Sequence, residues 1–266
     1  VPPNSMRLSP PPIAAAPVAS SPFFQGVHTV TRNRLHLAAS VMIVASLTAL
    51  GNLCAADAQR VCEPFNGKDL SGWKTVAPQG SQWVVGVAKI DPANPARLLV
   101  SEAEAGKGEF INREAHGVDI YSEEEFGDCT VSLEVMVPKG SNSGVYLMGN
   151  YEVQVLDSWG REKVGPGDIG GLYGAAAPKL NAAKAPGEWQ QFVIEFQAPR
   201  FQDGKKVANA VFKKVLLNGQ VIHENVEMSG VTGGSLGRGE QPRGPLMFQG
   251  NHGAVAYRKI CITVAK

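Results

Sequence analysis

The sequence predicts an all-β fold made of two packed antiparallel sheets. No helical hydrophobic period of useful length follows residue 58, whereas roughly ten to twelve short apolar or alternating stretches do, with turn signals between them. The chain has 30 glycines and 18 prolines among 266 residues. This composition is typical of many turns between short strands.

Residues 1–58 are expected to lie outside this fold. Residues 1–26 are rich in Pro, Ala and Ser without an apolar period, which predicts a disordered lead or a start site placed too early. An uncharged apolar run over residues 35–50 follows two arginines, and Ala56-Asp-Ala58 offers a small-residue cleavage site. A run of about 16 residues is short for a membrane span. We expect a signal peptide cleaved after Ala58, one β-sandwich domain over residues 59–266, and a periplasmic or secreted protein.

The almost neutral net charge argues against two classes of partner. Lysine and arginine number 25 against 24 acidic residues, so a net charge of +1 gives no reason to expect nucleic acid or a membrane surface.

Cys62, Cys129 and Cys261 remain after the expected cleavage, and an odd number leaves at least one thiol free. A bridge between Cys62 and Cys261 is conceivable, although buried thiols are the simpler interpretation of Cys129 and Cys261.

The strands can be placed in order from the apolar stretches. Residues 102–125 are polar and Gly-rich, so a long loop with one short strand is expected there, with His116 and Asp119 exposed and inert. Residues 157–188 and 231–243 are further expected loops. A connection as long as residues 157–188 is usually functional. The expected strands are a short edge strand at the start of residues 61–73, then residues 82–90, 97–101, 129–137, two within 142–157, then 189–197, 207–217, 220–226, 246–249 and 255–264.

The segment Asn142-Ser-Gly-Val-Tyr-Leu-Met-Gly-Asn-Tyr-Glu-Val-Gln-Val-Leu-Asp157 is expected to form a hairpin with one polar face. A two-residue loop would put Glu152 on the face of Val145 and Leu147. A three-residue loop over residues 149–151 would align it with Tyr146 and Met148, which separates polar from apolar side chains better. Alternation alone favours an ordinary solvated sheet face. The functional hypothesis is the floor of a carbohydrate site, formed by Glu134, Tyr146, Glu152 and Gln154 and rimmed by Asn142 and Asp157.

The C-terminal segment offers a second group of candidates. Gln249, Asn251 and His252 lie where a strand breaks into a loop, and a histidine there is a candidate for acid or base catalysis because its pKa is near neutrality. Arg258 has the parity of Ile260 and is therefore expected past the core edge or paired with Asp157 or Glu152. Trp159 and Tyr173 in the long loop could stack on sugar rings.

Ordered short motifs over residues 61–266 resemble the 3-keto-disaccharide hydrolase domain family. One departure is Lys259-Ile260, where the family usually has Asn-Ile after the arginine. The motifs are Phe65-Asn-Gly-Lys-Asp-Leu-Ser-Gly-Trp73, Asn142-Ser-Gly-Val-Tyr146, Tyr151-Glu-Val-Gln-Val-Leu-Asp157, Leu172-Tyr-Gly174, Gly187-Glu-Trp-Gln190, Asn218-Gly219, Gly244-Pro-Leu246, the segment 249–253 and Tyr257-Arg258.

The resemblance implies a concanavalin A-like jelly roll, an exported protein and cleavage of glycosides oxidised at C3. A C3 ketone acidifies the C2 proton, so a base can remove it, the C1 group can leave, and water can then add. On this hypothesis His252 or Glu152 is the base, Arg258 and Gln154 stabilise charge or orient the sugar, and Asp157 positions a partner.

Two other functions stay open at this point. The same fold can serve as a non-catalytic glycan-binding module, and Glu134 with Glu152 could act as an ordinary glycosidase pair. The expected partner in each case is an oligosaccharide or glycoside, with no membrane span after signal cleavage. No residue spacing is specific for a metal or another cofactor, so none is expected, and a divalent ion remains an alternative. Serine hydrolase, kinase, zinc protease and dinucleotide-binding motifs are absent from the sequence.

Overall fold

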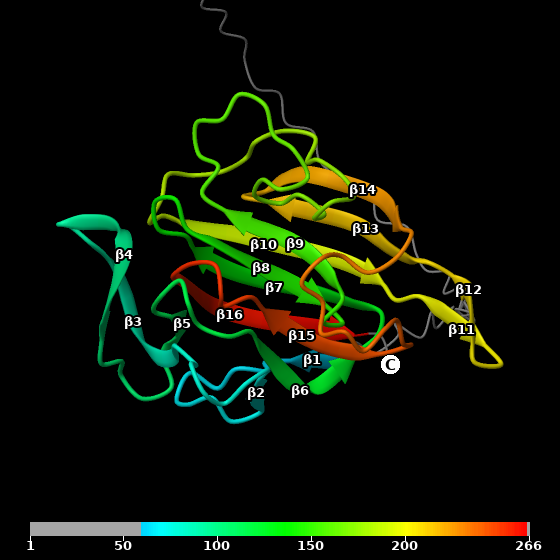
Figure 1. The fold of residues 1–266 in the computed structure, drawn as a ribbon, viewed down its shortest axis with the longest axis horizontal. Helices are drawn as coiled ribbons and strands as arrows, with labels where there is room; N and C mark the ends of the chain where they lie inside the picture. Colours follow the sequence, from blue (N-terminus) through cyan, green and yellow to red (C-terminus); the bar gives the residue numbers. More distant parts are fainter. Residues whose placement is uncertain (1–59, 265–266) are drawn as a thin grey trace, which may run out of the picture. The chain divides into compact units, whose positions relative to one another are not determined.

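A computed structural model describes residues 60–264, which form a sandwich of two antiparallel sheets without helices (Figure 1). The predicted all-β jelly-roll class is confirmed. The expectations for residues 1–58, including the signal peptide, lie outside the described residues. Residues 60–264 contain no helix that is long and apolar enough to cross a membrane.

The larger sheet has nine strands in the order β14-β13-β10-β7-β16-β5-β3-β4, with β1 paired to β16. Long antiparallel ladders between β7, β10 and β16 make its centre. Its strands are β1 (Arg60–Cys62), β3 (Trp83–Asp91), β4 (Asn94–Ser101), β5 (Glu109–Asn112), β7 (Cys129–Met136), β10 (Trp189–Gln197), β13 (Ala210–Leu217), β14 (Gln220–Met228) and β16 (Val255–Val264).

The smaller sheet has five strands in the order β2-β6-β15-β8-β9, and it carries the hairpin singled out in the sequence. A separate two-stranded ribbon joins β10 to β13. The strands of the smaller sheet are β2 (Trp73–Thr75), β6 (Ile120–Phe126), β15 (Gly244–Phe248), β8 (Asn142–Leu147) and β9 (Tyr151–Leu156), and those of the ribbon are β11 (Arg200–Gln202) and β12 (Lys205–Ala208).

The core lies between the two sheets, where alternate residues of each strand meet. Phe248 of β15 stacks on Tyr257 of β16, with ring centroids 4.1 Å apart and ring planes at 12°. Phe110 of β5 packs edge-on against Phe248. These rings carry the largest apolar areas in the fold, and offset or edge-on packing suits their quadrupoles. The aromatic contacts therefore fix how β15 and β16 face each other.

Residues 102–125 differ from the sequence-based expectation, because they form two strands and contribute to the core. Phe110 and Ile111 of β5 are fully buried. The neighbouring Glu109 is also buried, and its carboxylate accepts a hydrogen bond of 2.7 Å from the Ala88 amide. The prediction of a loop without core residues was wrong, since a four-residue buried strand between charged and glycine residues shows no readable alternation.

Two further local predictions need correction. The strand expected over residues 207–217 is divided between β12 and β13, with Asn209 at the break. The cysteine pair is not bonded in the structure: Cys62 and Cys261 are free, and the Cys62 thiol donates a hydrogen bond of 2.9 Å to Glu124. Cys129 is buried as expected, whereas Cys261, also expected to be buried, is only partly buried.

Candidate active site

The β8–β9 hairpin presents the polar face that the parity argument predicted. Tyr146 lies opposite Glu152, and Gly144 lies opposite Gln154. The side chains of Tyr146, Glu152 and Gln154 therefore share the face that points away from the core. Val145 and Val153 are fully buried on the other face. The predicted three-residue loop length is right, but the loop covers residues 148–150 rather than 149–151, so Met148 is in the turn and packs in the core.

Two loops cover this polar face and bury it, although the sequence indicated an open face. The Thr232 hydroxyl of the 231–243 loop accepts a hydrogen bond of 3.0 Å from the backbone N–H of Glu152. On the outer edge of β9, the backbone N–H of Gln154 donates a hydrogen bond of 2.8 Å to the Gly171 carbonyl. The long 157–188 loop therefore pairs with this edge. Glu152 and Gln154 are consequently only 2% and 3% exposed.

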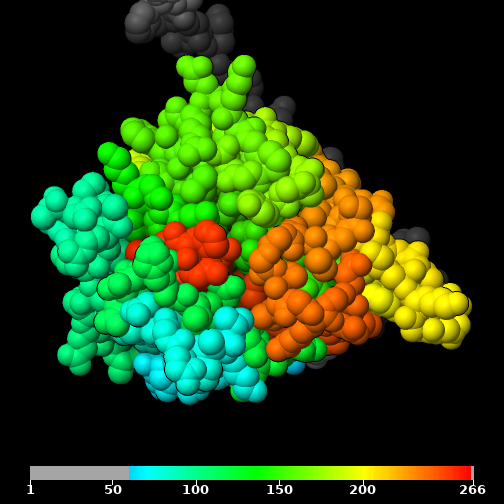
Figure 2. All heavy atoms as spheres, viewed as in Figure 1, coloured from blue at the N-terminus to red at the C-terminus, as the bar shows by residue number. Residues whose placement is uncertain are grey.

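A pocket of about 190 Å³ remains between the hairpin and its covering loops. This is smaller than the ~300–1,000 Å³ typical of drug-sized ligand sites, and it suits one small polar ring. Figure 2 shows a hollow between the orange 231–243 loop and the red strand-end segment. The pocket is lined by Asn142, Tyr146, Glu152, Gln154, Tyr173, Gly233, Gly234, Gln249 and His252.

Glu152 carries a carboxyl group at the floor of this pocket. Burial raises the pKa of Glu152 to about 7, a hydrogen bond from Tyr146 lowers it, and the charge on Asp119 raises it. The Tyr146 hydroxyl also lies 3.1 Å from the Gly233 carbonyl, so its proton can point to either acceptor. Burial keeps the pKa of Tyr146 above its usual value, and the hydroxyl therefore stays a donor. A carboxyl with a pKa near 7 can accept or release a proton at neutral pH.

Two glycines leave the space that Tyr146 and Glu152 occupy. A Cβ atom on Gly234, which has a φ of 75°, would lie 2.6 Å from the Tyr146 hydroxyl oxygen. A Cβ atom on Gly144 would lie 2.3 Å from Glu152 Oε1. The Gln249 amide nitrogen approaches the same Tyr146 hydroxyl at 3.4 Å. Residues 231–243 were predicted only as a loop, and no pattern in them indicates that Gly233 and Gly234 line the pocket.

His252 stands at the mouth of the pocket on a loop that buried groups hold in place. The Asn112 side-chain amide donates to the carbonyls of Gly250 and Gly253 at 2.9 and 2.7 Å. The exposed His252 ring is hydrogen-bonded through Nδ1 to the Asn251 side-chain oxygen. An amide oxygen only accepts, so Nδ1 is the donor in this contact, and Nε2 is the ring nitrogen that carries the second proton in the imidazolium form.

Asp119 belongs to the surroundings of the site, and the expectation that it is exposed and inert was wrong. Its carboxylate accepts the Gly250 amide at 2.9 Å, which anchors the first residue of the His252 loop. Burial raises the pKa of Asp119, while the hydrogen bond from Gly250 and the charge on His252 lower it. Its charge also raises the pKa of Glu152. His116 is exposed, as expected.

Arg258 and Glu134 do not reach the pocket. Glu134 is on β7 in the larger sheet, so the expectation that it shares a face with Glu152 was wrong. Arg258 donates to Glu134 at 2.6 Å, and its guanidinium lies 3.9 Å from the Trp189 ring centroid. The parity assigned to Arg258 fails because β16 has a bulge between Arg258 and Cys261, with Lys259 at a φ of 50°. Asparagine is enriched at such φ values, which accounts for the residue usual in the family.

Three other predicted residues lie outside the pocket lining. Asp157 accepts the amides of Gly140 and Trp159 at 2.8 and 3.4 Å, so it holds a turn. Trp159 is 59% exposed on the long loop, whereas Tyr173 of the same loop lines the pocket. Asn251 contacts His252 but does not line the pocket. The structure thus brings together Asn142, Tyr146, Glu152, Gln154, Tyr173, Gln249 and His252 from the predicted set.

No metal centre is apparent within residues 60–264, where no group of three or more His, Cys, Asp or Glu side chains is placed to hold an ion. The polar side chains at the pocket are three amides, two phenols, one carboxyl and one imidazole.

Substituting Arg258 by methionine tests its separation from the pocket. We expect kcat/KM to stay within about twofold of wild type, because the side chain contacts Glu134, Glu109 and Trp189 instead of the pocket. Stability should fall by about 1 kcal/mol, since these ion pairs are partly solvated and Glu134 keeps its contact with Lys259. Chemical denaturation and steady-state kinetics measure both. A tenfold loss of turnover in a folded variant would place Arg258 in the site after all.

Gly144→Ala tests the position of the Glu152 carboxyl. The new methyl group would meet Glu152 Oε1 and the fully buried Tyr146 ring, so the Glu152 carboxyl, at the end of a flexible side chain, is the group that has to shift. We expect kcat/KM to fall by about 100-fold, because a displacement near 1 Å of a reacting group has an effect of that size. Gly230→Ala is the matched control, since nothing lies within 4 Å of its added Cβ atom. Equal kinetics for the two variants would mean that the Glu152 position is unimportant.

The sandwich of two sheets carries a polar pocket on the outer face of one of them, and the comparisons with known proteins identify the chain as a carbohydrate-active enzyme of the hydrolase or lyase kind. The family described as "3-keto-alpha-glucoside-1,2-lyase-like domain" matches residues 63–263. The chain belongs to this family. The suspected resemblance is thereby confirmed.

Solved structures share the fold. A candidate glycosyl hydrolase from Parabacteroides distasonis ATCC 8503 is 26% identical, with a TM-score of 0.56 over 78% of this chain and 83% of that one. A second one from the same organism is 17% identical, with a TM-score of 0.52 over 77% and 94%, and shows the fold alone. No curated protein sequence matches the chain.

Proposed function

We propose that this protein cleaves 3-keto-glycosides by eliminating the group at C1 and hydrating the product. The observation that carries the proposal is the buried Glu152 carboxyl, with a pKa raised to about 7, in the same small pocket as His252. Membership of the family supports the substrate class.

The reaction requires three kinds of group. A base removes the proton from C2, which the neighbouring C3 ketone acidifies. Donors stabilise the oxygen of the resulting enolate, and an acid protonates the leaving oxygen at C1 as the C1–O bond breaks. Water then adds across the C1=C2 double bond, with its oxygen at C1 and a proton returned to C2. The sum of these steps is hydrolysis without change in oxidation state.

The pocket residues can supply each role. Glu152 is the proposed base, because a carboxylate with a pKa near 7 is a stronger base than an exposed one and is still half ionised at neutral pH. Tyr146 and the amides of Gln154 and Gln249 are the proposed donors to the C3 oxygen. His252, at the mouth, is the proposed acid for the leaving group. Arg258 and Asp157, considered from the sequence for orienting roles, have no part in this scheme.

The rival functions make different predictions. An ordinary glycosidase using Glu134 with Glu152 would need both carboxyls at one substrate, yet Glu134 is bound to Arg258 and Lys259 on the other sheet. A non-catalytic binding module would retain a glycan without turnover. Export to the periplasm or the medium remains part of the proposal, with the apolar run at residues 35–50 as its support.

The purified mature protein should be incubated with a 3-keto-glucoside and with its unoxidised parent. We expect release of the C1 group from the keto compound alone, because only the ketone acidifies the C2 proton. Product analysis by mass spectrometry should show 3-keto-glucose, preceded by the unsaturated intermediate. Binding of the parent without turnover of either compound would favour the binding module, and hydrolysis of the parent would favour the glycosidase.

A further inference from the structure

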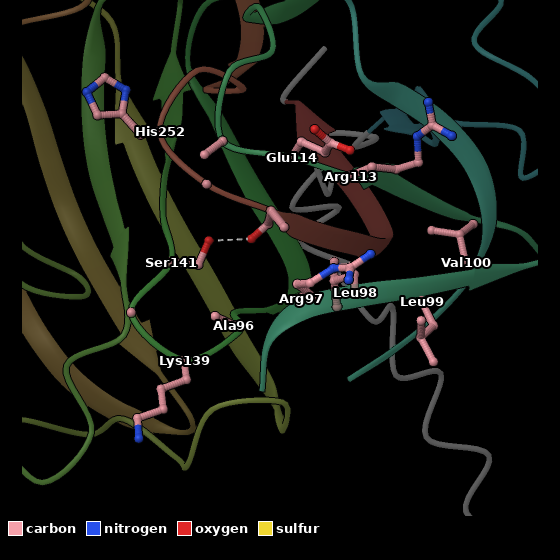
Figure 3. A pocket seen from close by; sticks show the side chains of 14 residues that line it. Ala96, Arg97, Leu98, Leu99, Val100, Arg113, Glu114, Lys139, Ser141 and His252 are labelled. Carbon is pink, nitrogen blue, oxygen red and sulfur yellow. Dashed lines mark hydrogen bonds between the residues drawn. The ribbon is translucent and has the colours of Figure 1, made fainter. Parts of the chain in front are cut away.

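A second, larger cavity adjoins the candidate active site. It has a volume of about 730 Å³, within the range of ~300–1,000 Å³ common for ligand sites. Its walls come from β4, from residues 113–115 after β5, from the 139–141 loop and from residues 252–254 (Figure 3). The Ser141 hydroxyl donates to the Ala254 carbonyl at 2.5 Å, which ties two of these walls together.

The two cavities meet at His252, which lines both. The sequence neighbours Ser141 and Asn142 line one cavity each. A ligand ring in the small pocket would therefore direct its substituent past the imidazole and toward the larger cavity. In the proposed reaction, the group next to the acid is the leaving group at C1.

The larger cavity is basic, although the whole chain is almost neutral. Arg97, Arg113 and Lys139 line it together with one carboxylate, Glu114, so three positive charges minus one negative charge leave +2. None of these four side chains forms an ion pair within residues 60–264. The Arg113 guanidinium donates to the neutral Gln82 side chain at 3.3 Å. The net charge of the chain is +1, so the positive charge here is local.

The same cavity offers an apolar surface. Leu99 of β4 lines it and is 47% exposed, and its side chain lies on the same face of the strand as that of Arg97. Guanidinium groups bind carboxylates through parallel hydrogen bonds, and exposed aliphatic side chains pack against a flat ring. The combination fits a leaving group with an apolar ring and an anionic substituent.

We propose that this basic cavity is the leaving-group subsite and that it selects glycosides whose leaving group carries a carboxylate. The proposal rests on the proposed function. Arg97 and Lys139 attract the anion, while Leu99, on the same face of β4 as Arg97, contacts its ring. These side chains are exposed to solvent, so the selectivity comes from several modest contributions.

The test compares two 3-keto-glucosides of the same anomeric form, one with a 4-carboxyphenyl and one with a 4-carbamoylphenyl leaving group. The ratio of their kcat/KM values is measured for the wild type, for Arg97→Gln/Lys139→Gln and for Lys205→Gln/Lys213→Gln. The last variant is a control with the same change in net charge, at exposed positions on β12 and β13. Division of one ratio by another cancels the intrinsic difference between the leaving groups.

We expect the ratio to fall by about fivefold to tenfold in Arg97→Gln/Lys139→Gln and to stay unchanged in the control, because solvated ion pairs contribute fractions of 1 kcal/mol each. Added salt should reduce the wild-type preference for the carboxylate, since exposed charges are screened. An equal ratio in all three proteins would overturn the subsite while leaving the proposed function intact. Absence of turnover of both compounds by the wild type would overturn the proposed function, and the subsite with it.

Discussion

Glu152→Gln is expected to lower kcat/KM on a 3-keto-glucoside by about 10²–10⁴-fold, the range for loss of a positioned general base. Glutamine keeps the size of the side chain and can still contact Tyr146, but it cannot accept the C2 proton. Because Glu152 lies in the pocket and not in the core between the sheets, the variant should fold. Steady-state kinetics with purified proteins measure the effect.

The pH dependence gives this prediction a specific form. The base acts as the carboxylate, and burial raises the pKa of Glu152 to about 7. With a 4-nitrophenyl 3-keto-glucoside, whose leaving group needs little protonation, the wild-type kcat/KM should therefore increase with pH up to about 7 and then level off as this group ionises. The residual activity of Glu152→Gln should lack that ionisation. A wild-type profile that is flat between pH 5 and 8 would exclude Glu152 as the base.

The same raised pKa predicts a gain in stability for the variant. The folded wild type binds a proton on Glu152 more tightly than the unfolded chain does, since the pKa rises from 4.5 to about 7. Its stability contribution is therefore present below pH 4.5 and is lost as the pH rises through 7, a loss of about 3 kcal/mol at ~1.4 kcal/mol per pKa unit.

Glutamine has no charge to desolvate, so Glu152→Gln should unfold at a higher temperature than wild type at pH 8 and at a similar one at pH 4. Thermal unfolding followed at both pH values measures this. A variant that is destabilised by the same amount at both pH values would mean that burial does not disfavour the ionised carboxylate.

The local part of the site could be predicted from the sequence. The faces of β8 and β9 follow from alternation across one short turn, so Tyr146, Glu152 and Gln154 could be assigned to one side without knowing the rest of the fold. Gln249 and His252 follow β15, the strand adjacent to β8, and their place at the strand end was readable as well.

The errors came from long-range pairing. Glu134 lies on the polar side of an alternating strand, but nothing in the sequence indicates that this strand, β7, belongs to the other sheet. Arg258 was assigned by parity, and one bulge reverses parity for all residues before it. The covering loop with Gly233 and Gly234 was missed because a glycine-rich loop has no periodic pattern that indicates what it packs against.

His252→Ala should separate the proposed acid from the proposed base, because its effect should depend on the leaving group. A methyl 3-keto-glucoside expels a strongly basic alkoxide unless an acid protonates it, so kcat/KM should fall by about 10²–10³-fold. A 4-nitrophenyl 3-keto-glucoside expels a weakly basic phenolate that needs little protonation, and the loss should be less than about tenfold. Glu152→Gln should reduce turnover of both compounds to a similar extent, since both lose the C2 proton.

His116→Ala is the matched control, because this histidine is exposed and does not line either cavity. Equal losses on the two compounds in His252→Ala would exclude a role for His252 as leaving-group acid and would leave it as a base or a binding residue. Full turnover in both His252→Ala and Glu152→Gln would refute the assignment of the pocket as the catalytic site. The acid role also explains the position of His252, since the residue that protonates the departing oxygen has to stand between the pocket that holds the ring and the cavity that receives the leaving group.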